Sequence, residues 1–119
     1  MGVQHVVLFQ FPAPLSEEDE RQMHAMVAEW PKAIGGFTKL RLGVDLNEGE
    51  RAQGYQYLLH SEHPDEAGLR AYQADPVHQE FSRWVHAREC RVLAFDYELD
   101  STTVLVGDEA ADPAQRGMQ

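Results

Sequence analysis

The sequence lacks three features that would narrow its class. It has a single cysteine, Cys90, which excludes an internal disulfide and which we interpret as a packing residue. Its longest uninterrupted apolar run covers only residues 6–9, whereas a membrane-spanning helix needs about 20 residues. The N-terminal residues lack the three parts of a signal peptide, which are a charged N-terminal region, a long apolar core and a small-residue cleavage site. We therefore expect a cytoplasmic protein in a reducing compartment.

Basic residues are also scarce. Ten lysines and arginines face twenty aspartates and glutamates, which gives a formal charge of −10 at pH 7. Such a surface repels phosphate backbones and anionic lipids, so we expect neither nucleic acid nor membrane as a partner. The 119 residues, 43% apolar and 25% charged, are typical of one globular domain.

Hydrophobic periodicity predicts four strands and two helical regions. The strands are expected over residues 3–11, 37–46, 55–62 and 91–99, and the helical regions over 16–33 and 65–90. Ser16 is the predicted N-cap of the first helix, whose end is disturbed by Pro31 and closed by Gly35 and Gly36. The second region breaks at Asp75, a predicted N-cap followed by proline.

The resulting order, β-α-β-β-α-β, predicts an α+β, ferredoxin-like fold. In this fold a four-stranded antiparallel sheet carries both helices on one face. We assign residues 1–100 to this domain and residues 101–119 to a C-terminal extension, with a candidate fifth short strand over 102–107 followed by a polar, acidic tail.

Both faces of the first predicted strand are apolar. One face carries His5, Val7, Phe9 and Phe11, and the other carries Gln4, Val6, Leu8 and Gln10. Only one of the two sets can face the helices, so the other leaves apolar sheet in water. Monomers rarely expose large apolar patches, and a two-fold interface covers identical patches with each other. We therefore predict a homodimer in which the two sheets pack together.

Four stretches together resemble the stress-responsive α/β-barrel (Dabb) family. They are "HVVLFQF" in the first strand, "GYQYLLHSE" in the third, "LRAYQADPVHQEF" before the last helix and "VLAFDYE" in the last strand. The resemblance spans roughly residues 3–98, and its most specific part is the pattern AYxxxPxHxxF. It implies a dimeric α/β barrel with a pocket between sheet and helices in each subunit. Plant polyketide cyclases belong to this family.

The resemblance also implies site residues. The cyclases use a tyrosine and a histidine that match Tyr72 and His78, and a strand-one histidine that matches His5 lies in the same cavity. The positions that match the cavity lining are Val7, Phe9, Met23, Val27, Tyr57, Leu59 and Phe81. Tyr57 departs from the pattern because the cyclases have histidine there. The resemblance therefore predicts the cavity and leaves the substrate open.

Residue chemistry supports acid–base work at this site. His78 is the third residue of its predicted helix, where the positive end of the dipole disfavours a cation and keeps an imidazole neutral. Tyr72 is a candidate donor to a carbonyl oxygen. A base and a donor on one wall suit proton abstraction next to a carbonyl group, without metal or cofactor. The expected ligand is a small apolar molecule that bears a carbonyl or hydroxyl group.

Other roles remain open. His78 and His5 can form a hydrogen-bonded pair that Tyr72 completes as a buried structural cluster, or the three can bind a ligand without reacting with it. The protein as a whole can be a non-enzymatic stress-associated structural protein. It can also be a ferredoxin-like, cofactor-independent monooxygenase or a haem-linked relative. An enclosed cavity next to His5 and His78 favours the small-molecule function.

The remaining histidines and aromatic residues receive structural interpretations. His60 and His63 lie three positions apart in a strand, so their rings point to opposite faces, and we predict no shared metal site and expect both rings at a solvated strand end. The resemblance leaves the binding of a divalent cation open. Several further residues are expected outside the site: His24 and His86 at the surface or rim, Trp30 and Trp84 in the core, Asp96 and Tyr97 on an edge strand.

Overall fold

The computed structural model describes residues 2–47 and 50–106. The elements follow in the order β1 (Val3–Gln10), α1 (Glu17–Ala28), α2 (Trp30–Ala33), β2 (Lys39–Val44), β3 (Tyr57–His63), α3 (Glu66–Ala74), α4 (Pro76–Ala87), β4 (Arg91–Glu98) and a short 3-10 helix, η1 (Leu99–Ser101). This order confirms the predicted β-α-β-β-α-β succession. Each predicted helical region consists of two helices.

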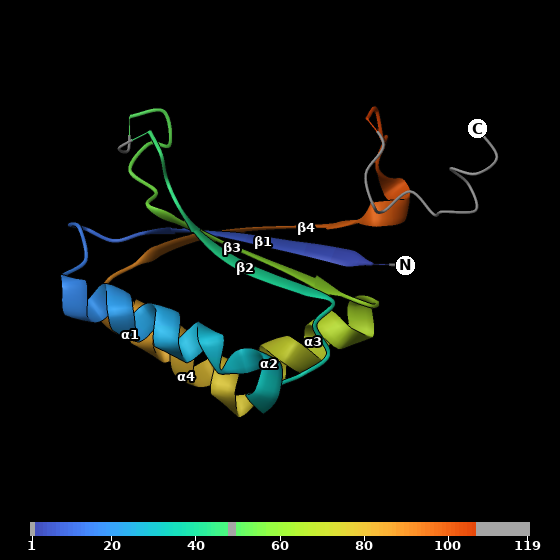
Figure 1. The fold of residues 1–119 in the computed structure, drawn as a ribbon, viewed down its shortest axis with the longest axis horizontal. Coiled ribbons are helices and arrows are strands. Elements are labelled where there is room, and N and C mark those ends of the chain that lie inside the picture. Colours follow the sequence, from blue (N-terminus) through green and yellow to red (C-terminus); the bar gives the residue numbers. More distant parts are fainter. Residues whose placement is uncertain (1, 48–49, 107–119) are drawn as a thin grey trace.

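The four strands form one antiparallel sheet in the order β2-β3-β1-β4, so β2 and β4 are its edges. The helices α1 to α4 all lie on one side of this sheet (Figure 1). This is the ferredoxin-like fold that the sequence predicts. In the single chain the sheet is open, and its two edges do not meet to close a barrel.

The helix boundaries follow the predicted caps. The Ser16 hydroxyl accepts a hydrogen bond from the Asp19 amide at 3.0 Å and begins α1. Pro31 lies in the first turn of α2, directly after the break at Glu29. The Asp75 carboxylate accepts from the Val77 amide at 2.8 Å, so it ends α3 and begins α4 as an N-cap. The predicted break at Asp75 is confirmed.

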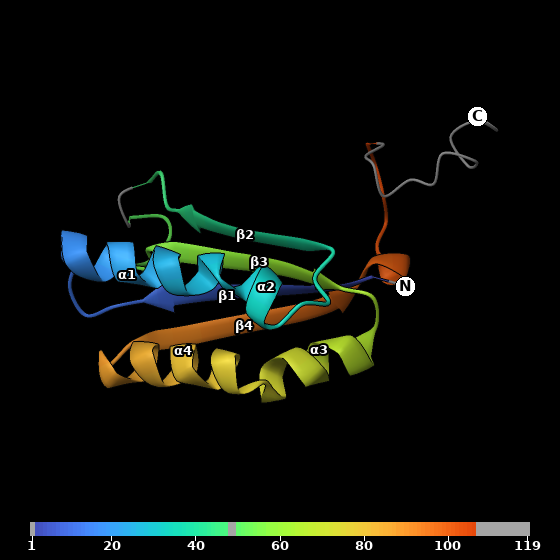
Figure 2. The same cartoon turned by 60° about the horizontal axis from the view of Figure 1, so that its bottom comes forward.

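The core lies between the helices and the sheet face that they cover. Trp30 and Met23 have no exposed surface, which confirms Trp30 as a core residue. Trp84 is only partly buried, and it packs against the outside of this core. Figure 2 shows α1 over the centre of the sheet, with α3 and α4 running along β4. No helix in the described part of the chain is long and apolar enough to cross a membrane.

The other sheet face is uncovered. It carries the exposed apolar side chains of Leu58, Leu93 and Phe95, of which Phe95 is 66% exposed. The strand register places Val6 beside Phe95 and Leu8 beside Leu93. The predicted apolar outer face is therefore present in the single chain.

Beyond η1 the chain leaves the sheet. Residues 102–106 adopt no strand, in contrast to the short strand expected over 102–107. Residues 107–119, which make up the rest of the expected extension, lie outside the described residues.

Candidate functional site

The strand register creates one polar row on the helix-covered face. His5 in β1 is paired with Ser61 in β3 on one side and with Asp96 in β4 on the other. Paired residues of antiparallel strands project to the same face, so these three side chains lie next to one another. The next two rows toward the end of β1 are mainly apolar, and they contain Leu59, Val7 and Ala94, then Tyr57, Phe9 and Val92.

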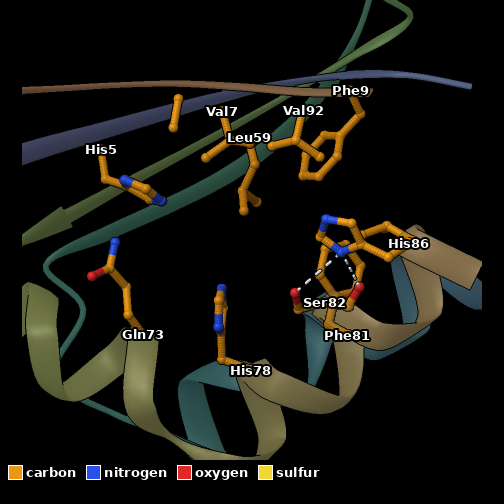
Figure 3. Close-up of a pocket in the computed structure, with 12 residues that line it drawn as sticks. His5, Val7, Phe9, Leu59, Gln73, His78, Phe81, Ser82, His86 and Val92 are labelled. Atoms are coloured by element: carbon orange, nitrogen blue, oxygen red, sulfur yellow. Dashed lines mark hydrogen bonds between the residues drawn. The ribbon is translucent and has the colours of Figure 1, made fainter. Parts of the chain in front are cut away.

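A cavity of about 160 Å³ lies between these rows and the last two helices (Figure 3). The sheet contributes His5, Val7, Phe9, Leu59, Val92 and Ala94 to its wall. The helices contribute Gln73, His78, Phe81, Ser82, Val85 and His86. An apolar cavity of about 150 Å³ holds a benzene molecule, so this one has the size of a single ring.

His5 is held in one orientation by Asp96. The imidazole is 4% exposed, and its Nδ1 lies 2.5 Å from the Asp96 carboxylate oxygen Oδ1. A carboxylate only accepts, so in the neutral ring Nδ1 carries the proton and Nε2 has the lone pair. Figure 3 shows the ring pointing into the cavity. The hydrogen-bond partner of His5 is therefore Asp96 and not His78, and Asp96, although it lies on an edge strand as expected, belongs to the site.

His78 lies in the first turn of α4 and points into the same cavity (Figure 3). Burial lowers the pKa of its imidazole, and the nearby His5 lowers it further. The backbone of Gln73 and the charge of Asp75 act in the opposite direction and raise the pKa of His78 in part. The ring is therefore neutral at pH 7, and burial is the main reason. Its Nδ1 is buried and has no hydrogen-bond partner among the described residues.

Tyr72 lies behind the cavity and is not part of its wall. It is 2% exposed, and its ring centroid lies 4.4 Å from that of His78, 4.9 Å from that of His63 and 5.7 Å from that of His5. Burial raises the pKa of the phenol, and the Asp96 charge raises it further, so the hydroxyl stays protonated. This hydroxyl has no partner within the described chain.

The prediction of a solvated strand end is wrong for His63. Its side chain is covered and only 1% exposed, and its Nε2 lies 2.9 Å from the Ser61 hydroxyl oxygen. Burial lowers the pKa of His63 to about 4. His60 faces the opposite side of the sheet, where its Nε2 lies 2.7 Å from Gln4 Oε1. In the part of the chain that the structure describes, no three histidine, cysteine or acidic side chains are placed to hold a metal.

The predicted lining residues divide between two regions. Val7, Phe9, Leu59 and Phe81 lie in the cavity wall, whereas Met23, Val27 and Tyr57 do not. Met23 and Val27 instead fill the core under α1. The Tyr57 hydroxyl instead donates to Glu20 Oε2 at 3.0 Å, and burial raises its pKa to about 12. The cavity is therefore closed on the side of α1 and confined to α3, α4 and the sheet.

Four helix residues of the cavity wall were not among the predicted site residues, namely Gln73, Ser82, Val85 and His86. Of these, His86 was expected at the surface or rim, and it is exposed and also lies in the wall. A spacing of four residues joins His78, Ser82 and His86 on one stripe of the helix, and this spacing is visible in the sequence. The sequence analysis did not identify this stripe as part of the cavity because no known motif contains it.

The cavity combines an apolar middle with reactive groups at one end. The Nε2 atom of His5 can accept a proton, and a neutral His78 can donate one hydrogen bond. The burial of His5 strengthens such interactions, because the local dielectric is lower than in water. This arrangement suits proton transfer on a small, mainly apolar molecule.

Solved structures show the same fold. Hydroxynitrile lyase from Passiflora edulis matches with a TM-score of 0.74 and 20% identity, covering 87% of this chain and 97% of that one. A dimeric ferredoxin-like protein of unknown function from Thermobifida fusca matches with a TM-score of 0.71 and 25% identity, covering 83% and 92%. A mutant of SnoaB, a cofactor-independent oxygenase from Streptomyces nogalater, matches with a TM-score of 0.63 and 16% identity, covering 85% and 95%.

No curated protein matches the chain. The family model of the stress responsive A/B barrel domain (Dabb) matches residues 3–99, which is most of the chain and includes all four strands. The pairing of β1 with β4, which brings His5 to Asp96, lies within this match. The chain therefore belongs to the stress-responsive A/B barrel family.

Proposed function

We propose that the protein is a homodimer that binds a small carbonyl compound in each cavity and catalyses proton transfer at the carbon next to the carbonyl group. The observation that carries this proposal is the contact of 2.5 Å between His5 Nδ1 and Asp96 Oδ1 at the end of an apolar cavity. A histidine whose Nδ1 is bound by a carboxylate presents Nε2 as a base in a fixed direction.

The reaction uses the chain's own residues. His5 Nε2 takes a proton from the carbon next to the carbonyl group. The electron pair of the broken C–H bond moves toward the carbonyl oxygen and gives an enolate. The enolate becomes a neutral molecule again when His5 returns the proton. The neutral His78 imidazole donates a hydrogen bond to that oxygen, and Asp96 stabilises the His5 cation. Such acid–base catalysis contributes about 10²–10⁴-fold in rate. Return of the proton to a different atom gives an isomerase, and attack of the enolate carbon on a second carbonyl gives a cyclase.

Tyr72 receives a positioning role in this proposal. It packs behind both reactive rings and does not border the cavity, so we assign the contact with the carbonyl oxygen to His78. Its buried hydroxyl remains protonated and is a reserve donor only for a ligand that enters more deeply. This differs from the sequence prediction, in which His78 is the base and Tyr72 the donor.

Two kinds of similarity support the proposal. The Thermobifida fusca protein is described as dimeric, and the uncovered apolar face of this chain is suited to pack against a second copy. The Passiflora edulis protein is named for hydroxynitriles, which are hydroxyl-bearing small molecules. SnoaB is named as a cofactor-independent oxygenase. In this chain His5 supplies a base and His78 a hydrogen-bond donor, and we therefore favour proton transfer over oxygenation.

Deuterium exchange tests the function directly. Acetophenone has one ring and a methyl group next to its carbonyl, so loss of its methyl signal in D₂O reports proton abstraction by NMR. We expect the wild-type protein to accelerate the exchange above the buffer rate, and the variant His5→Ala to lose at least tenfold of that rate. His24→Ala is the matched control, since this exposed histidine lies outside the cavity wall.

Two results contradict the proposal. The first is a wild-type exchange rate equal to that of buffer together with no binding of acetophenone, which favours a structural role for the family fold. The second is an unchanged rate in His5→Ala.

A further inference from the structure

We propose that His86 and Ser82 form a second polar subsite at the far end of the cavity, and that the substrate is a one-ring aromatic carbonyl compound with a hydroxyl group opposite the carbonyl. This inference rests on the proposed function of the same cavity and specifies its substrate class. Figure 3 shows the subsite at the opposite end from His5 and Gln73.

The subsite lies on the same stripe of α4 as His78. Residues 78, 82 and 86 follow one another at intervals of four, and all three border the cavity. Eight residues of an α-helix rise about 12 Å. The wall between the two ends is apolar and includes Val7 and Leu59. A ligand that fills the cavity therefore meets polar groups at its two ends and apolar side chains along its middle.

The hydrogen bonds of His86 define what the subsite accepts. His86 Nδ1 lies 2.7 Å from the backbone carbonyl oxygen of Ser82 and 3.4 Å from its hydroxyl oxygen. A carbonyl oxygen only accepts, so in the neutral ring Nδ1 carries the proton and Nε2 is an acceptor. Figure 3 shows the other nitrogen of this ring on the cavity side. The subsite therefore selects a group that donates a hydrogen bond, such as a hydroxyl, over an ether.

The other end of the cavity has the opposite preference. Arg70 Nη1 donates to Gln73 Oε1 at 3.1 Å, which leaves the amide nitrogen of Gln73 to donate. Figure 3 shows this side chain reaching toward His5. His78 adds a second donor when its imidazole is neutral. Donors at this end suit a carbonyl oxygen, so the two ends together fix the direction in which a ligand binds.

The cavity size suits a ligand with one ring. Its volume of about 160 Å³ is close to the roughly 150 Å³ of a cavity that binds benzene. A ligand with polar groups on opposite sides of one ring makes a hydrogen bond of about 2.8 Å at each end. The length of the ring, its two groups and the two hydrogen bonds is comparable to the rise of the helix between His78 and His86. A hydroxyl opposite the carbonyl therefore reaches the subsite.

Three matched ketones test the inference in calorimetric titrations of the full-length protein. They are 4-hydroxyacetophenone, 4-methoxyacetophenone, which keeps the oxygen without its proton, and acetophenone. We expect the hydroxylated ketone to bind the wild-type protein roughly two- to tenfold more tightly than the other two, the range for one net hydrogen bond. The variant His86→Ala should remove this preference, so that it binds the three ketones with equal affinity.

His24→Ala is the control variant. His24 Nδ1 also lies 2.9 Å from the carbonyl oxygen four residues earlier, that of Glu20, so it has the same local geometry on another helix. The substitution should change none of the three affinities. Equal affinities of the wild-type protein for all three ketones, or a preference that survives in His86→Ala, would overturn the inference while the proposed function stands. Failure of the wild-type protein to bind any of the three overturns both.

Discussion

Each face of the sheet carries residues that are unusual for its environment. The face under the helices buries a serine, two histidines and part of an aspartate, whereas the outer face exposes a leucine and a phenylalanine that are 50% and 66% exposed. Neighbours in one strand, such as Val7 and Leu8, lie on different faces although both are apolar. Buried polar groups and exposed apolar patches are the informative exceptions in a folded protein. Here the buried polar groups mark the candidate site, and the exposed apolar patch marks the proposed dimer interface.

The largest expected effect concerns the outer face. The double substitution Leu93→Asp and Phe95→Asp places charge on the patch that we propose to be the dimer interface. Burying one fully exposed side chain of this kind stabilises by about 1.5–3 kcal/mol, and these two residues are 50% and 66% exposed, so in two copies they contribute roughly 3–7 kcal/mol before the cost of association. We expect a dimeric mass for the wild-type protein and a monomeric mass for the double variant, by light scattering at micromolar concentration.

A control tests whether added charge alone dissociates the dimer. Ala28→Asp adds a charge at an exposed position of α1, away from the outer face, and should leave the dimer intact. A monomeric wild-type protein, or a double variant that remains dimeric, contradicts the assignment of the outer face.

The second prediction concerns acid stability on the covered face. The pKa of His63 is about 4 in the folded protein and about 6.5 in the unfolded chain, so the unfolded chain binds the proton first as pH falls. The stability from the neutral ring is complete above about pH 6.5 and decreases as pH falls toward 4, by roughly 3 kcal/mol in total. The double variant Ser61→Ala, His63→Phe removes this dependence.

Denaturant unfolding at fixed protein concentration measures the difference. His60 and His78 also have lowered pKa values, but they are present in both proteins, so the difference between the two pH profiles isolates His63. The single variant Ser61→Ala controls for loss of the hydroxyl. Parallel pH profiles of the wild-type protein and the double variant would show that His63 is not buried as described.

The third prediction concerns the orientation of His5. In Asp96→Asn the carboxamide no longer requires a proton on Nδ1, so the imidazole loses its fixed direction. We expect at least a tenfold decrease in the deuterium exchange rate, which corresponds to about 1.4 kcal/mol, with a change in unfolding free energy below about 1 kcal/mol. Glu98→Gln, two positions along the same strand, should have no effect on exchange, and an equal loss in both variants would point to general electrostatics.

The smallest effect is expected on the side of α4 that faces away from the cavity. Arg88 makes two contacts with the Asp19 carboxylate, at 3.2 and 3.3 Å, and its guanidinium lies 3.8 Å from the centre of the Trp84 ring. The Arg88 and Asp19 side chains are 30% and 32% exposed, and pairs of this kind contribute about 1 kcal/mol or less. Arg88→Met should lower stability by that amount and leave ketone binding unchanged in calorimetry. A change in ketone affinity would show that this contact shapes the cavity.

The sequence predicted the parts of the fold that depend on local signals. The alternation in Val3–Gln10, the Ser16 cap and the Asp75–Pro76 break depend on residues that are near one another in the chain, and all three are confirmed. The uncovered apolar face followed from the same alternation. These features need no knowledge of how strands are paired.

The site depended on contacts between distant residues. Asp96 meets His5 only because β4 pairs with β1 in one register, and no local pattern specifies that register. His63 is buried because another part of the chain covers a strand end that appears polar in the sequence. The lining positions Met23 and Val27 have helical spacing toward the core, as predicted, but their buried side chains belong to the packed core under α1 and not to the cavity wall.

The proton on His5 tests the central claim most directly. In protein labelled with ¹⁵N-histidine and held at about pH 8.5, above the ordinary histidine pKa of about 6.5, NMR distinguishes the two neutral tautomers. The account predicts a proton on Nδ1 and a bare Nε2 in the wild-type protein, and loss of this preference in Asp96→Asn. A wild-type ring with its proton on Nε2 would contradict the account, because it would leave no base facing the cavity.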